Sequence, residues 1–449
     1  MIHKFSMENK NIVIDVYSGA VHEFDSVSFD VLDHVNKPKE EILEYFSNRY
    51  TKKDVLEAIE EIEQLRTQGL LFTDDPYEKM NLELSGEPVI KAACFHVSHD
   101  CNLRCSYCFA STGNFGGQRL NMGFDVGKDA VDFLIQNSGN RKNIEVDFFG
   151  GEPMLNFDVV KQIVEYTRGI EKEFNKNFRF TITTNALHLD DEKIDYINAN
   201  MANVVLSIDG RKEINDAMRK RIDGKGSYEK VIENIKRLVE KRGHKDYYVR
   251  GTFTKKNLDF FNDVMHLVDQ GFDQVSVEPV VAGKGTGYEI TLDDIDILKL
   301  EYEKLAKEYV IRAKSGKGFV FFHFLLDLSG GPCVSKRLRG CGSGSEYISV
   351  TPKGDIYPCH QFVGDKNFKL GNVKDGILNK ALQEKFKKSN VYTRQVCRSC
   401  WAKFYCSGGC PANAYQFEGD INSVYDVGCE LEKKRLECAL WIKAQENLS

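Results

Sequence analysis

The sequence lacks any long hydrophobic run. Its most apolar stretch, Phe319 to Leu328, is too short to span a bilayer and carries His323 and Asp327. The first residues, MIHKFSMENKNIVIDV, contain no apolar core before a small-residue cleavage site, so a secretory signal is not expected. These absences argue against membrane insertion and secretion, and we predict a cytoplasmic protein with no membrane partner.

Strong net charge is absent as well. The 449 residues carry a formal charge of -6 and have a pI near 6.0, so there is no whole-molecule attraction to nucleic acid or anionic lipid. Hydrophobic residues make up 42% and charged residues 29%, which is ordinary for a globular protein and argues against a disordered or fibrous chain. The sequence contains neither internal repeats nor low-complexity linkers, and its length predicts about three domains.

Cysteine, in contrast, is abundant. The chain has 13 cysteines, an odd number that fits a disulfide framework poorly when no secretory signal is present. Three lie between residues 101 and 108, and eight more lie between residues 333 and 429. This clustering favours metal ligation or redox chemistry. Only Cys94 and Cys438 stand apart, and we expect both to be buried apolar residues rather than ligands.

Residues 1–80 read as a small α/β domain. Three short runs have strand character, His3 to Met7, Asn11 to Val16 and Ala20 to Phe24, and helical patterns follow them. The clearest helix spans Thr51 to Gln68, with Thr51 as a plausible N-cap. Three strands followed by three helices is the shape of a winged-helix-like domain.

The charge of this domain argues against DNA as its ligand. The helix carries Glu57, Glu60, Glu61 and Glu63, whereas a DNA-binding helix would be basic. An exposed edge strand that accepts an extra strand from a peptide is the better hypothesis, and we predict a peptide-recognition domain without a nucleic-acid partner. A passive packing domain is the alternative.

Strand and helix patterns alternate over residues 88–315. Six βα units predict a parallel sheet with helices on its outer face, and six are too few to close a full barrel, so we expect an α/β fold with an open, partial (β/α)6 barrel. Functional groups should gather where the strands end. The predicted strands are Ile90–Val97, Ile144–Phe149, Phe178–Thr183, Val204–Ile208, Tyr247–Phe253 and Val275–Val280.

The first cysteine array follows the first of these strands. Cys101, Cys105 and Cys108 form CxxxCxxC, and three thiolates on one loop would leave one iron of a [4Fe–4S] cube free to bind a chelating ligand. Zinc loops show similar spacings. With Tyr107 just before the third cysteine, the array resembles the radical S-adenosylmethionine (SAM) enzymes. The resemblance implies reductive cleavage of SAM to a 5′-deoxyadenosyl radical, with these three cysteines as cluster ligands and catalytic residues.

Further motifs stand at the ends of the next strands. Phe149-Gly-Gly-Glu-Pro153 resembles the GGEP motif of that family, and Ser207-Ile-Asp-Gly210 resembles the stretch that contacts the ribose and methionine of SAM. Thr183-Thr-Asn185 should face the same cavity, and Arg219 matches an arginine near the cofactor. Each motif alone is also compatible with an ordinary turn. The resemblance implies cofactor contacts from Tyr107, Gly150, Gly151, Glu152, Ser207 and Asp209.

The second cysteine field occupies the region 316–449. Its order, Cys341-x12-Gly354-x4-Cys359 and then Cys397-x2-Cys400-x5-Cys406-x3-Cys410 before Cys429, resembles the seven-cysteine signature of SPASM domains. The resemblance implies two auxiliary [4Fe–4S] clusters, so that the chain would hold three clusters in all. Cys397, Cys400, Cys406 and Cys429 would ligate the second auxiliary cluster, and Cys341, Cys359 and Cys410 the first. Cys333 either supplies an eighth ligand or is not a ligand, and in the second case one iron of the first auxiliary cluster stays open. Structural zinc is the alternative for this field.

The order of the three regions resembles the maturases of SCIFF peptides, short cysteine-rich precursors. The resemblance implies formation of thioethers between a peptide cysteine and a carbon of an acceptor residue, with an external one-electron reductant and a precursor peptide bound through the N-terminal domain. His360 stands where sulfatase-maturing enzymes have an aspartate that serves as the base. Its replacement by histidine weakens the prediction that this chain oxidises a serine or cysteine to formylglycine. The alternatives are another SPASM maturase, acting on sulfatases or a quinone-containing partner, and a non-catalytic zinc-binding winged-helix regulator.

Overall fold

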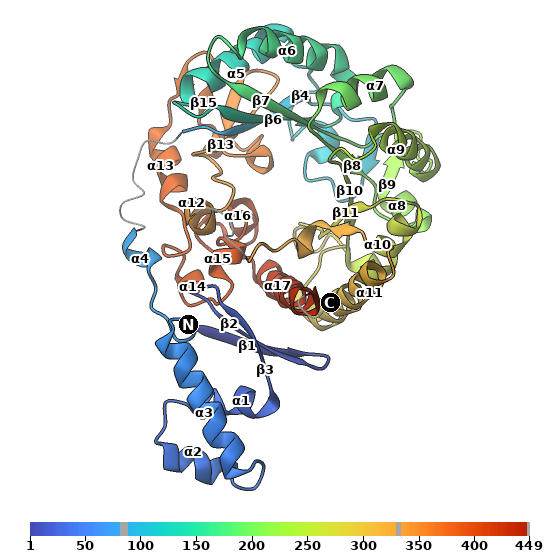
Figure 1. The fold of residues 1–449 in the computed structure, drawn as a ribbon. Coiled ribbons are helices and arrows are strands. Elements are labelled where there is room, and N and C mark those ends of the chain that lie inside the picture. The colour runs from blue at the N-terminus through green and yellow to red at the C-terminus, as the bar shows by residue number, and fades with distance from the viewer. Residues whose placement is uncertain (81–88, 329–333, 447–449) are drawn as a thin grey trace.

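The computed structural model describes residues 1–80, 89–328 and 334–446. The N-terminal domain projects from the rest of the molecule (Figure 1) and shows the predicted order of strands before helices, with three strands and then four helices where three helices were predicted. Its antiparallel sheet has the order β1-β2-β3, and Thr51 caps α3 by accepting a hydrogen bond from the Asp54 N–H. The elements are β1 (Ile2–Met7), β2 (Lys10–Asp15), β3 (Val21–Phe24), α1 (Ser26–Val31), α2 (Lys39–Phe46), α3 (Lys52–Thr67) and α4 (Tyr77–Met80).

The six predicted barrel strands are confirmed, and all pair in parallel in the order β4-β6-β7-β8-β10-β11. They are β4 (Ala92–Ser98), β6 (Asn143–Gly150), β7 (Asn177–Thr184), β8 (Asn203–Ser207), β10 (Tyr248–Phe253) and β11 (Gln274–Pro279). Helices cover the outer face (Figure 1): α5 (Phe124–Asn137), α6 (Phe157–Ile170), α7 (Asp191–Asn200), α8 (Lys212–Met218), α9 (Tyr228–Arg242), α10 (Phe260–Asp269) and α11 (Ile295–Lys314).

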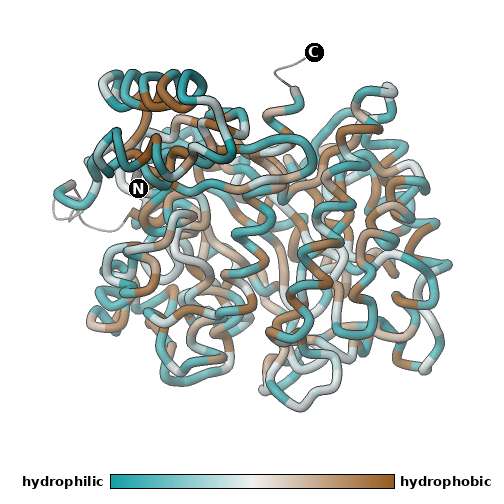
Figure 2. Tube along the Cα trace, turned by 90° about the horizontal axis from the view of Figure 1, so that it is seen from below, coloured by the Kyte–Doolittle hydropathy of each residue, from teal (hydrophilic) through white to brown (hydrophobic). Residues whose placement is uncertain are grey.

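The strand faces explain this layering. Along β6, Ile144, Val146 and Phe148 are buried against the helices, while Asp147 and Phe149 alternate with them and face the other side. Hydrophobic and hydrophilic stretches alternate along the trace (Figure 2). None of the described helices is long and apolar enough to cross a membrane.

The sheet extends further than the sequence predicted. β12 (Val320–Phe321) joins one end, and β13 (Tyr347–Val350) pairs in parallel with β4 at the other, followed by antiparallel β14 (Asp355–Tyr357), β15 (Gly371–Asn372) and β16 (Gly376–Ile377). The cysteine-rich region is therefore continuous with the barrel sheet. These strands are only two to four residues long, too short to show a period of two.

The C-terminal region is mostly helical. It contains α12 (Val334–Arg339), α13 (Lys380–Lys388), α14 (Gln395–Arg398), α15 (Lys403–Cys406), α16 (Pro411–Glu418) and α17 (Asp426–Glu446). The long α17 packs along α11 of the barrel. Cys438 on α17 and Cys94 on β4 are both fully buried, as predicted.

Candidate active site

The three cysteines of the first array lie together on the loop after β4. A two-stranded antiparallel sheet of β5 (Leu103–Cys105) and β9 (Arg219–Arg221) holds this loop, with Cys105 paired opposite Arg219. Burial raises the pKa of Cys101 to about 12 and that of Cys105 to about 11, and the neighbouring thiols contribute to the rise. Three neighbouring thiols without a disulfide fit a cluster that takes them as thiolates.

The glycines of the GGEP motif allow β6 to lie against the cysteine loop. A Cβ on Gly150 would stand 2.2 Å from the Ser98 carbonyl oxygen, and one on Gly151 would stand 2.2 Å from the Asp100 carbonyl oxygen. Gly150 also has φ +128, where side chains are strained. The Gly151 N–H donates to the Ser98 carbonyl over 2.8 Å, which extends the β4–β6 contact into the loop.

The Glu152 carboxylate is buried and already bound by protein donors. It accepts hydrogen bonds from the Thr184 hydroxyl at 2.6 Å and from the backbone N–H of Asn185 at 2.8 Å. Burial raises its pKa in spite of these bonds. The side chain therefore joins the ends of β6 and β7. The side-chain amide of Asn185 lies beside Cys101, with 3.6 Å between Nδ2 and Sγ.

A buried triad joins the cysteine loop to the end of β8. The Tyr107 hydroxyl donates to the Asp209 carboxylate at 2.7 Å, and the Arg219 guanidinium donates to the Tyr107 oxygen at 2.9 Å. The sequence predicted all three as cofactor neighbours without indicating that they bind one another. Burial raises the pKa of Asp209, although Arg219 stands 3.7 Å away. Ser207 closes β8 at the same edge of the sheet.

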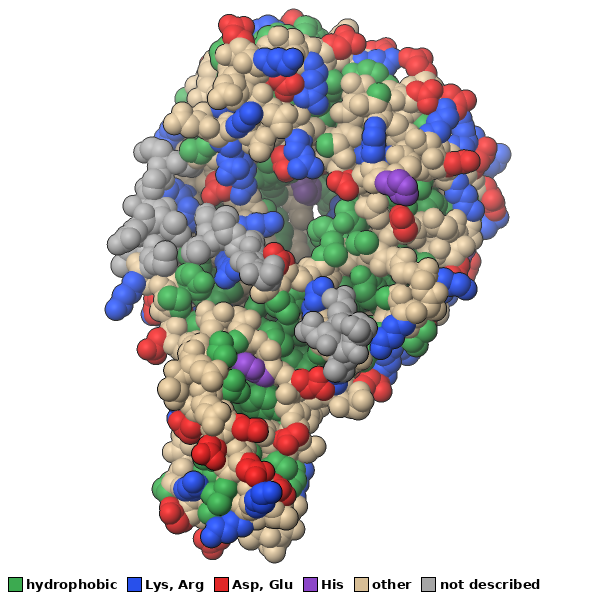
Figure 3. Space-filling model, viewed as in Figure 1, with side chains coloured by type: hydrophobic (Ala, Val, Ile, Leu, Met, Phe, Trp, Pro, Cys, Tyr) green, Lys and Arg blue, Asp and Glu red, His purple; other side chains and the backbone are tan. Residues whose placement is uncertain are grey.

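The barrel encloses a polar lumen that the sequence reasoning missed. Its wall includes Asp147 on β6, Thr183 on β7, Arg250 on β10, Glu278 on β11 and His323. Arg250 pairs with Glu278 at 2.5 Å, and its side chain is 44% exposed although its strand lies within the sheet. The opening at the centre of the space-filling view (Figure 3) leads into this lumen. The alternation of polar with apolar residues along β6, β10 and β11 could have predicted a polar inner face of the barrel.

His360 lies at the rim of the lumen beside the cysteine loop. Its ring is 5.2 Å from the ring of Phe149, which precedes the GGEP glycines, and 5.4 Å from that of Phe109, which follows Cys108. Burial lowers the pKa of His360 to about 4. Because His360 also follows Cys359, it joins the first cysteine array to the second field.

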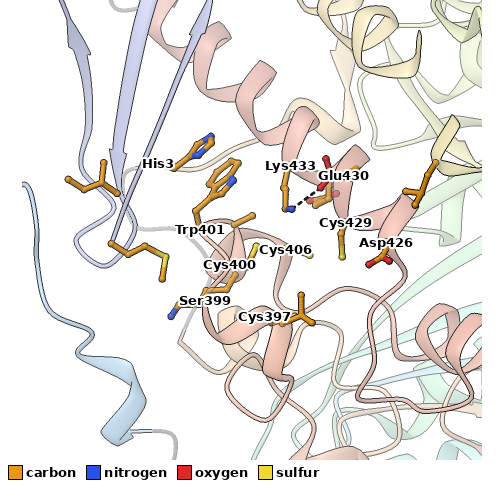
Figure 4. Close-up of a pocket in the computed structure, with 18 residues that line it drawn as sticks. His3, Cys397, Ser399, Cys400, Trp401, Cys406, Asp426, Cys429, Glu430 and Lys433 are labelled. Atoms are coloured by element: carbon orange, nitrogen blue, oxygen red, sulfur yellow. Dashed lines mark hydrogen bonds and ion pairs between the residues drawn. The ribbon is translucent and has the colours of Figure 1, made fainter. Parts of the chain in front are cut away.

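Four cysteines of the second field converge on one cavity of about 640 Å³. Cys397, Cys400, Cys406 and Cys429 line it from α14, α15, their connecting loop and α17 (Figure 4). Burial and the neighbouring thiols raise the pKa of Cys429 to about 11. These are the four residues predicted for the second auxiliary cluster, and the donor set fits an all-cysteine iron–sulfur site.

The other predicted set is also brought together. Burial raises the pKa of Cys359 to about 12, with contributions from nearby Cys410 and Cys341. Cys333 lies outside the described residues. Within the described parts of the chain, no three His, Cys, Asp or Glu side chains converge as tightly as a single bound ion requires.

The N-terminal domain meets the cavity of the four cysteines directly. His3 of β1 stacks on Trp401, the residue after Cys400, with 3.8 Å between ring centroids (Figure 4). Beside it, the buried Lys403 ammonium lies 3.2 Å from Asp75 and over the rings of Tyr17, Tyr392 and Phe404. The N-terminal domain therefore packs against the region of these four cysteines.

On its other side the N-terminal domain carries an open groove of about 560 Å³. One wall is β3, which has no further neighbour in the described sheet, and the other is α3. Phe24, Ile62 and Leu65 give the groove apolar surface, and Glu23, Asp25 and Glu61 line its polar part. An edge strand beside an apolar groove is suited to an extended peptide.

Two family models match the chain. The radical SAM superfamily model covers residues 95–259, and the model of the SPASM iron-sulfur cluster-binding domain covers residues 341–401. Among curated proteins, the radical SAM cyclopropyl synthase TigE of Paramaledivibacter caminithermalis is 20% identical over 92% of this chain and 89% of its own. The cysteine-type anaerobic sulfatase-maturating enzyme of Clostridium novyi is 25% identical over 71% and 86%.

Two solved structures share the fold of this chain. The structure "Native anSMEcpe with bound AdoMet and Cp18Cys peptide" has a TM-score of 0.66 at 22% identity and covers 81% of this chain and all of its own. Streptococcus suis SuiB bound to precursor peptide SuiA has a TM-score of 0.50 at 18% identity, over 95% and 98%. Fold, cysteine loop and matches together define a radical SAM enzyme. The chain carries a radical SAM domain followed by a SPASM domain, so S-adenosylmethionine and iron–sulfur clusters are its cofactors.

Proposed function

We propose that this enzyme is a peptide maturase that forms thioether crosslinks within a cysteine-rich, SCIFF-like precursor peptide in the cytoplasm. The observation that carries the proposal is the combination of three parts in one chain: the cysteine loop at the barrel mouth, two further sets of cysteines in the C-terminal region, and a peptide-sized groove on the N-terminal domain. The chain aligns over most of its length with SuiB, whose structure contains a precursor peptide.

The proposal assigns three [4Fe–4S] clusters. Cys101, Cys105 and Cys108 would hold the radical SAM cluster, and the two further sets would hold the auxiliary clusters. When bound, the first cluster and SAM supply the 5′-deoxyadenosyl radical, given one electron from an external reductant. The chain's own contribution is positioning: Gly150 and Gly151 bring the end of β6 to within contact of the loop, and the Tyr107–Asp209–Arg219 triad fixes the loop against β8.

The N-terminal groove would bind the leader segment of the precursor by strand addition to β3. Holding the leader there raises the effective concentration of the attached core peptide at the barrel mouth. The anSMEcpe and SuiB structures each contain a bound peptide, which supports a peptide as the substrate class.

Sulfatase maturation is the second candidate, because a sulfatase-maturating enzyme is among the relatives. Oxidation of a serine or cysteine to formylglycine needs a base next to the substrate. In this sequence His360 stands where the sulfatase-maturing enzymes have the aspartate that serves as this base. The absence of that carboxylate favours thioether formation over sulfatase maturation.

Anaerobic incubation of the reconstituted enzyme with SAM, reductant and a cysteine-rich precursor tests the proposal. Tandem mass spectrometry should show the loss of two hydrogen atoms per crosslink and fewer thiols that react with an alkylating reagent. Cleavage of SAM with every precursor left unchanged in mass would refute it, and formylglycine in a sulfatase peptide would favour the second candidate.

Leader binding is tested separately with a groove variant. Leu65→Lys places a charge on the apolar part of the groove and should raise the Kd of a labelled leader peptide about tenfold, with uncoupled SAM cleavage unchanged. Leu43→Lys is the matched control, since Leu43 is a partly buried leucine on α2 that does not line the groove. Equal affinities of the two variants would remove the groove from the proposal.

A further inference from the structure

The lumen contains one carboxyl group that lacks an ion pair among the described residues. Asp147 receives hydrogen bonds from the Thr183 hydroxyl, at 3.2 and 3.4 Å to its two oxygens, and no described Lys, Arg or His lies within ion-pair distance. The other lumen carboxylate, Glu278, is bound by Arg250 at 2.5 Å. Of the two lumen carboxylates, Asp147 is therefore the one without an ion-pair partner among the described residues.

Asp147 lies near the cysteine loop. Asp147 and Phe149 are successive residues on the lumen face of β6, so their Cα atoms lie about 7 Å apart along the strand. Phe149 in turn stacks over Phe109, the neighbour of Cys108, and borders His360. A peptide residue that enters the lumen from the barrel mouth, past the cysteine loop, therefore comes close to Asp147.

The surroundings of Asp147 favour a proton acceptor. Burial raises its pKa to about 7, against a smaller opposing effect of the Thr183 hydroxyl and Arg250. The titratable groups that face it are Cys94 on β4 and Tyr347 on β13, and burial holds both of their pKa values well above the usual range. Both stay protonated at neutral pH, so neither competes for a proton. A base is most effective when its pKa is near the working pH.

We propose that Asp147 accepts the proton that leaves the substrate cysteine when the thioether forms. This inference rests on the proposed thioether function. One C–H bond and one S–H bond break and one C–S bond forms. The hydrogen atom of the carbon goes to the deoxyadenosyl radical, the thiol proton goes to the Asp147 carboxylate, and the remaining electron goes to an acceptor of the iron–sulfur class.

The other polar groups of the lumen are less suited to this step. His323 is held between Arg435, at 3.0 Å from Nδ1, and the Ser276 hydroxyl, at 3.3 Å from Nε2, and its pKa is lowered to about 3. Glu278 has its pKa lowered to about 2 by Arg250 and the neighbouring cations. Groups with such low pKa values are weak bases near neutral pH.

The test compares Asp147→Asn, which keeps the shape of the side chain, with Glu145→Gln on the exposed end of the same face of β6. The wild-type crosslinking rate should rise with pH and level off above about pH 7. The Asn variant should crosslink about 100-fold more slowly, without that rise, while it still releases deoxyadenosine. Glu145→Gln should behave as wild type.

A second measurement does not depend on turnover. Infrared difference spectra of the chain between pH 5 and pH 8 should show a carboxylic acid band that the Asn variant lacks and Glu145→Gln retains. Unchanged crosslinking with an unchanged pH profile in the Asn variant would overturn the role of Asp147. Failure of the wild-type enzyme to crosslink any precursor would instead overturn the proposed function, whatever the infrared result.

Discussion

Replacing Gly150 by alanine tests the structural role of the GGEP glycines. The added Cβ would lie 2.2 Å from the Ser98 carbonyl oxygen, and Gly150 has φ +128, so either the residue or the cysteine loop must move. The strained backbone costs about 1–3 kcal/mol. Losing the hydrogen bonds from Gly151 to Ser98 and from Glu152 to Asp100, both 2.8 Å, adds about 1 kcal/mol each. We expect a local cost of about 3–5 kcal/mol.

The destabilisation affects the loop that would hold the radical SAM cluster. It does not affect the SPASM cysteines, which lie on other elements. Gly150→Ala should therefore lose about four irons per chain and its SAM cleavage, while the remaining iron stays bound. Iron analysis and deoxyadenosine release measure the two effects. Gly169→Ala is the control: Gly169 sits on the exposed side of α6 with no atom within 4 Å of an added Cβ, so alanine there should be neutral or stabilise by up to about 1 kcal/mol.

The reasoning is refuted if Gly150→Ala binds as much iron and cleaves SAM as fast as Gly169→Ala. Loss of all iron would also contradict it, because the damage would then extend beyond the loop.

Three further predictions concern other parts of the chain. Tyr107→Phe removes the hydroxyl that joins Asp209 and Arg219, and it should weaken SAM binding about tenfold in equilibrium dialysis, whereas Tyr166→Phe, which loses a peripheral bond to Asp132, should not. Lys403→Met leaves Asp75 without its ammonium partner and weakens the contact between the N-terminal domain and the C-terminal region. Hydrogen exchange of the β1 amides should become more than tenfold faster, and unchanged exchange would contradict this role of Lys403. The pKa of Glu278 is lowered to about 2, so its ion pair stabilises the fold above about pH 4.5 and this contribution is lost as the pH falls toward 2. Glu278→Gln should accordingly lower the urea midpoint at pH 7 and lower it by roughly half as much at pH 3, where the carboxylate of the folded protein is still mostly ionised; equal shifts at both pH values would contradict this.

Several features of the fold followed from sequence because they rest on local patterns. The six barrel strands and their helices have clear periodicity, and the cysteine spacings carry chemistry that few folds share. The cap at Thr51 was predicted because a threonine before a helix binds a backbone N–H three residues later. Strands β12 to β16 were missed, since two to four residues cannot show alternation.

The sequence by itself identified the candidate residues for the chemistry: the cysteine loop, the glycines after β6 and the seven cysteines of the SPASM region. Only the tertiary structure decided which residues lie together, because the contacts of Tyr107 with Asp209 and with Arg219 each join residues more than a hundred positions apart. The same holds for the polar lumen and for His3 against Trp401. Each depends on strands and domains that approach one another in space, and a linear pattern contains no record of those distances.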